Sequence, residues 1–304
     1  MAISSHLLPA DAKNFEVIEF PDISFNPSGL QSKKLQLTSI EEIDEFSKWT
    51  SLISKRKNAE AMKLVKESLV KHPDWCAGYY FLGKHAEAEL DDDIALEMYS
   101  KALNNRPNCL SALEARGFQY DARNENSKAI RDFQQTYFLT SGQNKQRMRI
   151  RLAKTYLKAK NYNLGQKFSR DAKVVEPKNA FVRLIEIDCC LKQKLWRQAI
   201  NLCDDALIAK IPSARFYLQR AEAECGLSLF KDVIRDCDKY LNLKTQDTDF
   251  LPDQKLAHSI KGRALAALGR RQQAKLDSRQ VIRSDAALFD DTIFLDTRKI
   301  YTKR

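Results

Sequence analysis

The stretch that decides the fold is residues 76–109, CAGYYFLGKHAEAELDDDIALEMYSKALNNRPNC. It carries an aromatic residue and a Leu-Gly pair in its first half, then small residues, a second aromatic residue and a closing proline. With Cys76 as position 1, positions 4, 7, 8, 20, 24, 27 and 32 are Tyr79, Leu82, Gly83, Ala95, Tyr99, Ala102 and Pro107. Because proline lacks an N–H and disfavours helix in the residue before it, Pro107 predicts the end of a helix.

The same pattern recurs along the chain. Related units begin at residues 42, 76, 110, 146, 180, 214 and 255. Four of the six intervals between these starts are 34 residues, and the unit that starts at residue 42 is degenerate. A fixed period of this length is the sequence signature of a repeat architecture.

These units resemble the tetratricopeptide repeat family, whose period is 34 residues. The resemblance implies an all-α, right-handed superhelical solenoid of about seven helix-turn-helix repeats. Each repeat pairs two antiparallel helices, which bury their apolar stripes against neighbours. We expect position 8 to face position 20, so that both must be small, and large side chains at positions 4, 11 and 24 to fill the remaining space.

The N-terminal segment, residues 1–41, differs from the repeats. Prolines interrupt its short apolar pieces, and no helical period is visible. We expect an extended or partly ordered arm. In an alternative interpretation, Phe20, Ile23 and Phe25 form a docking segment that lies in the protein's own groove or in a partner.

The repeat array is predicted to span residues 42–286. Residues 244–252 lengthen one interval by seven residues and are predicted to form a surface loop. Residues 287–304 are predicted to form a capping helix or tail, because repeat arrays need a terminal element with a polar outer side.

Composition excludes several classes of protein. Glycine is scarce, with nine in 304 residues, and no phosphate-binding glycine motif is present. The seven cysteines are an odd number without a C-x-x-C pair, which predicts reduced, buried thiols in a cytosolic protein. The sequence shows neither a membrane-spanning run nor a signal peptide, so we expect a cytoplasmic location.

Catalytic and metal-binding patterns are also missing from the sequence. Asp91, Asp92 and Asp93 fall between two predicted helices, where a turn and a helix N-cap explain them. The four histidines are far apart, and no zinc spacing occurs. Cys190 falls at position 11, a core position. We therefore expect no enzyme activity, no cofactor, no metal and no small-molecule substrate.

The net charge of +11 indicates acidic partners. Residues 145–160 hold seven basic residues and no acidic one, and residues 261–283 hold seven against a single aspartate. Such clusters leave nucleic-acid binding as an alternative, although no aromatic platform accompanies them. A further alternative is an accessory subunit of a secretion, motility or signalling complex.

The resemblance also implies a binding groove, because first helices line the concave face of tetratricopeptide repeat proteins. Residues carried over to this groove are Tyr80, Lys84, Phe118, Arg147, Arg151, Lys154, Asp188, Gln219 and Arg263. Arg147, Arg151 and Lys154 share one helix face by their i, i+4 and i+3 spacing, so they can converge on one acidic group.

One subset of the family grips the acidic tail of cytosolic chaperones with a clamp of lysines, asparagines and an arginine. Arg147 and Arg151 match its last pair of positions, but Lys84 and Ala115 stand where the two asparagines belong. We therefore reject chaperone-tail binding. The predicted function is a non-catalytic scaffold or adaptor that binds an acidic peptide or helix in the concave groove.

Overall fold

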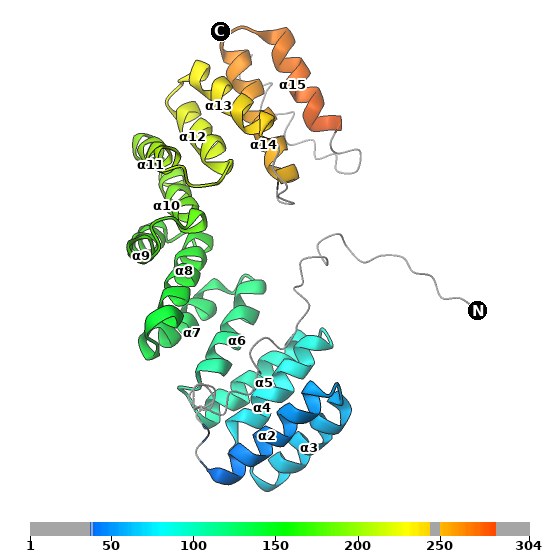
Figure 1. Cartoon of the computed structure of the whole chain (residues 1–304). Coiled ribbons are helices and arrows are strands. Elements are labelled where there is room, and N and C mark those ends of the chain that lie inside the picture. The colour runs from blue at the N-terminus through cyan, green and yellow to red at the C-terminus, as the bar shows by residue number, and fades with distance from the viewer. Residues whose placement is uncertain (1–36, 38, 244–249, 284–304) are drawn as a thin grey trace, which may run out of the picture. The chain divides into compact units, whose positions relative to one another are not determined.

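The computed structural model describes residue 37 and residues 39–243 and 250–283 (Figure 1). Every regular element in this part of the chain is an α-helix, which confirms the predicted all-α class. The described helices are α2 (Ile40–Ser54), α3 (Asn58–Lys71), α4 (Cys76–Ala88), α5 (Asp92–Asn105), α6 (Leu110–Ala122), α7 (Asn126–Leu139), α8 (Gly142–Lys158), α9 (Tyr162–Val175), α10 (Ala180–Lys192), α11 (Trp196–Ile208), α12 (Arg215–Gly226), α13 (Phe230–Asn242), α14 (Phe250–Ala267) and α15 (Arg271–Arg283).

One type of turn joins the two helices of every described hairpin. Its key residue has a left-handed backbone with φ between 58° and 75°, and the next N–H donates back into the first helix, as from Asp91 to the Ala86 carbonyl (2.9 Å). This is the Schellman arrangement that ends many helices. The left-handed residues are 34, 34, 36, 34, 34 and 41 apart; they are Arg56, Leu90, Asn124, Lys160, Lys194, Ser228 and Gly269.

Polar side chains begin several helices. The Asp91 carboxylate accepts a hydrogen bond from the Ile94 N–H (3.1 Å), and Asp92 and Asp93 lie in the first turn of α5. Negative charge is stabilised there by the helix dipole. The predicted N-cap is therefore confirmed.

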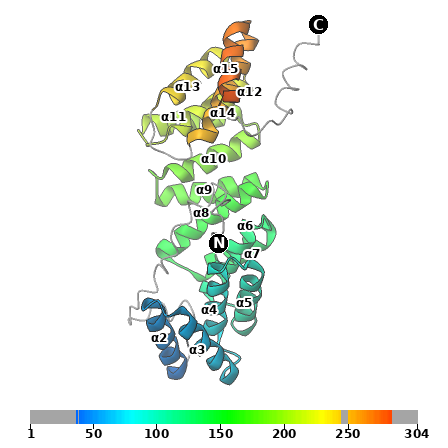
Figure 2. The same cartoon turned by 90° about the vertical axis from the view of Figure 1, so that its right-hand side faces the viewer.

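The first compact unit, residues 1–145, holds three described hairpins. They are α2 with α3, α4 with α5, and α6 with α7. Each second helix also packs against the first helix of the next hairpin, α3 on α4 and α5 on α6, so the hairpins stack (Figure 2). Aromatic rings fill the core near α2, where Phe46 and Phe81 meet edge to face with centroids 5.5 Å apart.

The second compact unit, residues 146–304, contains the remaining hairpins. Helix α8 begins just before this unit and packs on α9 through the stacked rings of Tyr156 and Phe168, 5.6 Å apart. Hairpins α10–α11, α12–α13 and α14–α15 follow and stack on one another. The first helices α10, α12 and α14 also contact each other in turn, so together they form one continuous helix face.

Small and soft residues fill the space between paired helices. Ala274, at position 20 of the last unit, is half-buried, and the other alanines at positions 20 and 27 are fully buried: Ala61, Ala95, Ala102, Ala129, Ala172, Ala199 and Ala206. Six of the seven cysteines are buried, the seventh is half-buried, and none forms a disulfide. This confirms the prediction of buried thiols outside a disulfide framework.

The reason for glycine at position 8 differs from the one expected. A Cβ on Gly83 would lie 2.5 Å from the ring of Tyr99, and one on Gly117 would lie 2.6 Å from the ring of Phe133. Both rings belong to position 24, not to position 20. The prediction that position 20 dictates a small position 8 is therefore wrong for these two repeats, because the aromatic ring lies over the glycine.

The segments between and beyond the repeats are described only in part. Helix α14 begins at Phe250, so the predicted loop at residues 244–252 is wrong for its last three residues. Pro252 fits because a helix tolerates proline in its first turn. Residues 244–249, the predicted cap at 287–304 and most of the arm at 1–41 lie outside the described residues, while α2 already begins at Ile40. Within the described part, no helix has the length and apolar character needed to cross a bilayer.

Candidate functional site on the first helices

The nine predicted groove residues all lie on first helices. The first unit carries Tyr80 and Lys84 on α4 and Phe118 on α6, and the second carries Arg147, Arg151 and Lys154 on α8, Asp188 on α10, Gln219 on α12 and Arg263 on α14.

The two aromatic residues of the first unit pack into their own repeats. The Tyr80 ring lies 6.0 Å from the ring of Tyr99, and burial raises the pKa of Tyr80 above its usual range. The Phe118 ring lies 5.4 Å from the ring of Phe133. Part of the surface of both side chains is therefore buried against the core of their own repeats.

A polar link joins α4 to α6 beside these rings. Lys84 forms an ion pair with Glu87, three residues further along α4. Nε2 of Gln119 on α6 donates to the other Glu87 oxygen, at 2.9 Å. The sequence analysis did not single out Glu87 or Gln119. The i, i+3 spacing of Lys84 and Glu87 could have indicated the ion pair, because such residues are neighbours on a helix surface.

Helix α8 presents the basic face of the second unit. Arg147 and Arg151 are exposed and Lys154 is half-buried. The buried residues of α8, such as Met148 and Leu152, occupy other sides of the helix. The three cations thus share one accessible face, as their spacing predicts.

Asp188 and Gln219 link α10 to α12. Nε2 of Gln219 donates to Oδ1 of Asp188 (2.6 Å) and to the backbone carbonyl of Leu184 (3.2 Å). Burial raises the pKa of Asp188 to about 6, and the hydrogen bond from Gln219 opposes that rise. Since Gln219 is only 6% exposed, it holds two helices together and offers little surface to a ligand.

Further along the same helix face, an ion pair joins α12 to α14. Nε of Arg215 lies 2.9 Å from a carboxylate oxygen of Asp253. Arg263, on α14, is exposed. Asp253 was not singled out from the sequence, because it lies between the predicted loop, which ends at residue 252, and the repeat unit that starts at residue 255.

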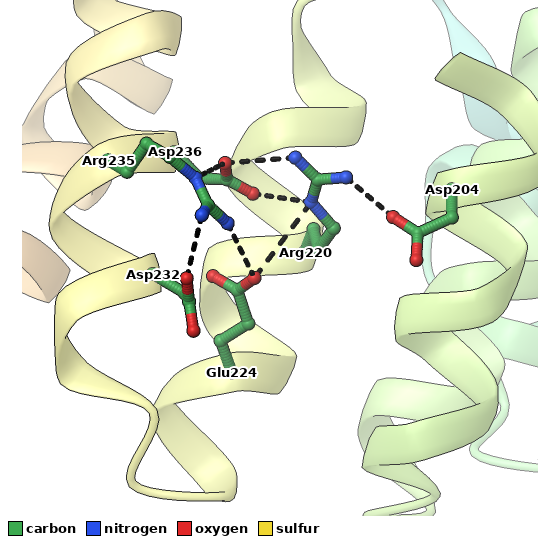
Figure 3. A network of polar contacts seen from close by, with 6 residues as sticks. All are labelled: Asp204, Arg220, Glu224, Asp232, Arg235 and Asp236. Carbon is green, nitrogen blue, oxygen red and sulfur yellow. Dashed lines mark hydrogen bonds and ion pairs between the residues drawn. The ribbon is translucent and has the colours of Figure 1, made fainter. Parts of the chain in front are cut away.

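A larger polar network connects α11, α12 and α13 (Figure 3). Arg220 donates to the fully buried Asp236, with Nη2 to Oδ1 at 2.9 Å, and to Asp204. Glu224 lies beside them, and its side chain is 6% exposed. Desolvation is the main cause that raises the pKa of Glu224 to about 7, and the negative charge of Asp236 adds to it.

These arrangements link helices. The described residues contain no group of three or more His, Cys, Asp or Glu side chains that could hold a metal ion. His72 stacks on Trp75 with centroids 4.1 Å apart, and Nδ1 of His258 lies 2.9 Å from Asp277. The described histidines with contacts thus take part in local packing and pairing.

Comparisons with known proteins identify the fold. No family model matches the chain. A crystal structure of a tetratricopeptide repeat protein from Parabacteroides merdae aligns with 84% of this chain and 96% of its own, with a TM-score of 0.56 and 16% identity. The chain has the tetratricopeptide repeat fold.

Two other solved structures agree with this assignment. YrrB, a tetratricopeptide repeat protein described as having an unusual peptide-binding site, aligns with 64% of this chain and 95% of its own, with a TM-score of 0.51 and 14% identity. PilW, a type IV pilus biogenesis factor, aligns with 71% of this chain and 99% of its own, with a TM-score of 0.51 and 10% identity. At these identities the likeness concerns the fold alone.

Among curated proteins, Suppressor of RPS4-RLD 1 from Arabidopsis thaliana is 43% identical over 81 residues. The matched segment is 27% of this chain and 7% of that protein. The similarity is therefore confined to a short part of a much longer protein.

In a tetratricopeptide repeat protein, stacked repeats create extended surfaces that can bind partners. On the first helices of this chain, Gln219 and Asp188 are engaged in links between helices, and Tyr80 and Phe118 are partly engaged in packing. The exposed cations of α8 and Arg263 are the first-helix groups with the most accessible surface among the nine.

Proposed function

We propose that this protein is a non-catalytic scaffold or adaptor that binds an acidic peptide or helix of a partner protein. The observation that carries the proposal is the basic face of α8, formed by Arg147, Arg151 and Lys154. It lies in a segment, residues 145–160, that contains no acidic residue.

The chemistry of these side chains favours a carboxylate ligand. A guanidinium presents a planar fork of donors that matches a carboxylate, and the hydrogen bonds are charge-assisted. Arg147 and Arg151 are one helical turn apart, so they can grip acidic groups roughly 6 Å apart, given a rise of 1.5 Å per residue. Lys154 adds a third cation on the same face.

The fold supports the general part of the proposal. Tetratricopeptide repeats are stacks whose surfaces suit protein partners, and one structural neighbour is described by its peptide-binding site. In the second unit, we propose that Asp188 and Gln219 hold the binding surface in shape and that Arg263 contacts the partner away from α8. In the first unit, we assign Tyr80, Lys84 and Phe118 to a neighbouring contact. The cysteines outside disulfides favour a cytoplasmic location.

The nucleic-acid alternative has less support. In the second basic segment, residues 261–283, Lys261 lies 2.8 Å from Asp238 and 3.4 Å from Asp277. Its charge is therefore largely neutralised within the protein. The accessory-subunit alternative has no residue-level support, because likeness to PilW at 10% identity bears on the fold only.

Charge reversal on α8 tests the proposal. A partner captured by affinity from cell extract is purified, and its affinity for the wild-type chain is measured by calorimetry at two salt concentrations. In the variant Arg147→Glu/Arg151→Glu/Lys154→Glu we expect affinity to fall by at least about a hundredfold, since like charges across an interface repel and buried pairs are lost.

A matched control carries the same charge change on second helices. Lys66 on α3, Arg131 on α7 and Lys167 on α9 are exposed, and their reversal to glutamate should leave affinity within about threefold of the wild type. Equal losses in the two variants would mean that net charge, and not the α8 face, governs binding. Circular dichroism checks that both variants remain helical.

A further inference from the structure

Helix α13 carries a row of three cations at intervals of four residues, and among the described second helices only α15 has a comparable row, which includes Arg271, Lys275 and Arg279. Lys231, Arg235 and Lys239 follow one another at intervals of four residues and are exposed. With the i, i+4 spacing they lie on one face of α13. We call these three residues the α13 stripe.

The repeat supplies an internal comparison, because the same three positions occur on every second helix. In α5 they are Asp93, Glu97 and Lys101, and in α11 they are Arg197, Asn201 and Asp205. The sets on α3, α7 and α9 are likewise mixed with neutral or acidic residues. In α15 the same positions are Gln272, Leu276 and Gln280, so three cations at these positions do not follow from the needs of the fold.

The α13 stripe borders a shallow, open depression of about 760 Å³. Its lining residues come from α12, from α13 and from the residue that follows α13; they are Tyr217, Lys231, Ile234, Arg235, Asp238, Lys239, Asn242 and Leu243. Nζ of Lys239 lies 5.4 Å from the centre of the Tyr217 ring. The depression thus combines cations with an apolar floor and an amide that can both donate and accept hydrogen bonds.

We propose that the α13 stripe is a second binding surface, separate from the α8 face, for an extended acidic peptide segment of a partner protein. The segment would carry acidic side chains at alternate positions. This surface goes beyond the proposed function, since it lies on a second helix and requires no residue of α8.

Spacing supports an extended segment. Successive cations of the α13 stripe are about 6 Å apart along the helix axis, at a rise of 1.5 Å per residue. In an extended chain, side chains on one face recur every two residues, about 6.6–6.8 Å. Three alternate acidic side chains can therefore meet the three cations almost in register, with Arg235 shared between the segment and its ion pairs to Asp232, Asp236 and Glu224.

The surroundings favour a peptide over a nucleic acid. Asp238 lines the depression, and its carboxylate can accept a backbone N–H, a donor that a peptide has and a phosphodiester backbone lacks. Asn242 can bond both the N–H and the carbonyl of a peptide backbone. Ile234 and Leu243 provide apolar contact for the intervening side chains.

Binding of a defined peptide to the full chain tests this surface. The probe is a short, end-capped fluorescent peptide with three glutamates at alternate positions, and anisotropy reports its affinity. A second peptide of identical composition has its glutamates in succession, and an oligothymidine of similar length is a third probe. We expect the alternating peptide to bind most tightly, and more weakly as salt rises.

The variant Lys231→Glu/Lys239→Glu should weaken binding of the alternating peptide at least about tenfold. Arg235 is left intact because it also pairs with Asp232 at 2.7 Å in the network of Figure 3. The control Lys167→Glu/Arg197→Glu reverses two exposed cations, one on α9 at the position of Arg235 and one on α11 at the position of Lys231, and should bind within about twofold of the wild type.

Each other result overturns the inference. The site is refuted if the wild type fails to bind the alternating peptide, if both peptides bind alike, or if the control loses as much affinity. Tighter binding of oligothymidine that depends on the α13 stripe would identify a phosphate site instead. If only the α8 variant loses the peptide, the α13 stripe is excluded while the proposed function stands.

Discussion

The hairpins α6–α7 and α12–α13 contain the same internal link in different surroundings. In both, an arginine of the first helix pairs with an aspartate 16 residues later on the second, Arg116 with Asp132 and Arg220 with Asp236. Both aspartates are buried. The link is therefore a repeated device that fastens the two helices of a hairpin.

The two links differ in the groups around the arginine. Arg116 reaches back to the Ser100 hydroxyl of α5 at 3.4 Å, whereas Arg220 reaches back to the carboxylate of Asp204 on α11. Where α6 has Tyr120, whose ring lies 5.8 Å from the Arg116 guanidinium, α12 has Glu224.

The difference changes the charge balance of the link. In α6–α7 one guanidinium faces one carboxylate beside neutral groups. In α12–α13 Arg220 faces three carboxylates, and Arg235 supplies only part of the missing positive charge. A repeat can thus keep its geometry while its electrostatics change from balanced to acidic.

Removal of the arginine should have the largest effect. In Arg220→Met the buried Asp236 and its neighbours lose their main cation, and we expect the free energy of unfolding to fall by about 3–5 kcal/mol, the range for a broken buried pair. Arg116→Met strands a single buried carboxylate, so its loss should be smaller. Urea unfolding followed by circular dichroism measures both.

Hydrogen exchange shows which helices are destabilised in each of the two arginine variants. Amides of α12 and α13 should lose protection in Arg220→Met, and those of α6 and α7 in Arg116→Met, because repeat proteins are stabilised by neighbouring contacts. If Arg116→Met costs as much as Arg220→Met, the number of carboxylates around the arginine is irrelevant to stability.

Replacement of Glu224 should have the next largest effect. Its pKa is about 7 in the folded chain against 4.5 in the unfolded chain. The folded state therefore binds the proton more tightly, and the stability this gives is complete below pH 4.5 and lost as pH rises through 7. In Glu224→Gln we expect a shallower fall of the unfolding free energy between pH 4.5 and 7, measured by urea unfolding across that range.

Two further variants sharpen this test. Asp188, whose pKa is raised to about 6 by burial, contributes with the same sign, so Asp188→Asn should remove a further part of the slope. Glu222→Gln, on the same helix as Glu224, removes a carboxylate outside the network. A slope reduced as much by Glu222→Gln as by Glu224→Gln would contradict our assignment.

The sequence predicted the repeated elements because they depend on local features. The 34-residue period, the Asp91 N-cap and the buried cysteines follow from spacing and from the preferences of single residues. The predicted partner of position 8 was wrong for Gly83, because the ring of Tyr99 lies over this glycine, and that contact depends on how two helices pack.

The candidate site could be predicted only in outline. Sequence position placed Arg147 and Arg151 on one helix face, but it gave no sign that Gln219 is buried in a link to Asp188. A charged residue in a helix usually lies in solvent, so Arg220 and Glu224 were passed over. Burial of such groups depends on partners from neighbouring repeats, and that information is spread over distant parts of the chain.

The turns of the two hairpins should give the smallest effect. Both reverse through a left-handed residue, Asn124 with φ of 58° and Ser228 with φ of 60°. Asparagine tolerates this conformation better than serine does, and glycine adopts it without a Cβ clash. We therefore expect Ser228→Gly to raise the free energy of unfolding by about 0.5–1 kcal/mol and Asn124→Gly to change it by less than about 0.5 kcal/mol. Thermal unfolding of the two variants measures both changes. An equal gain in unfolding free energy would show that side-chain chemistry at the turn does not distinguish these repeats. Their difference would then reside in the arginine links alone.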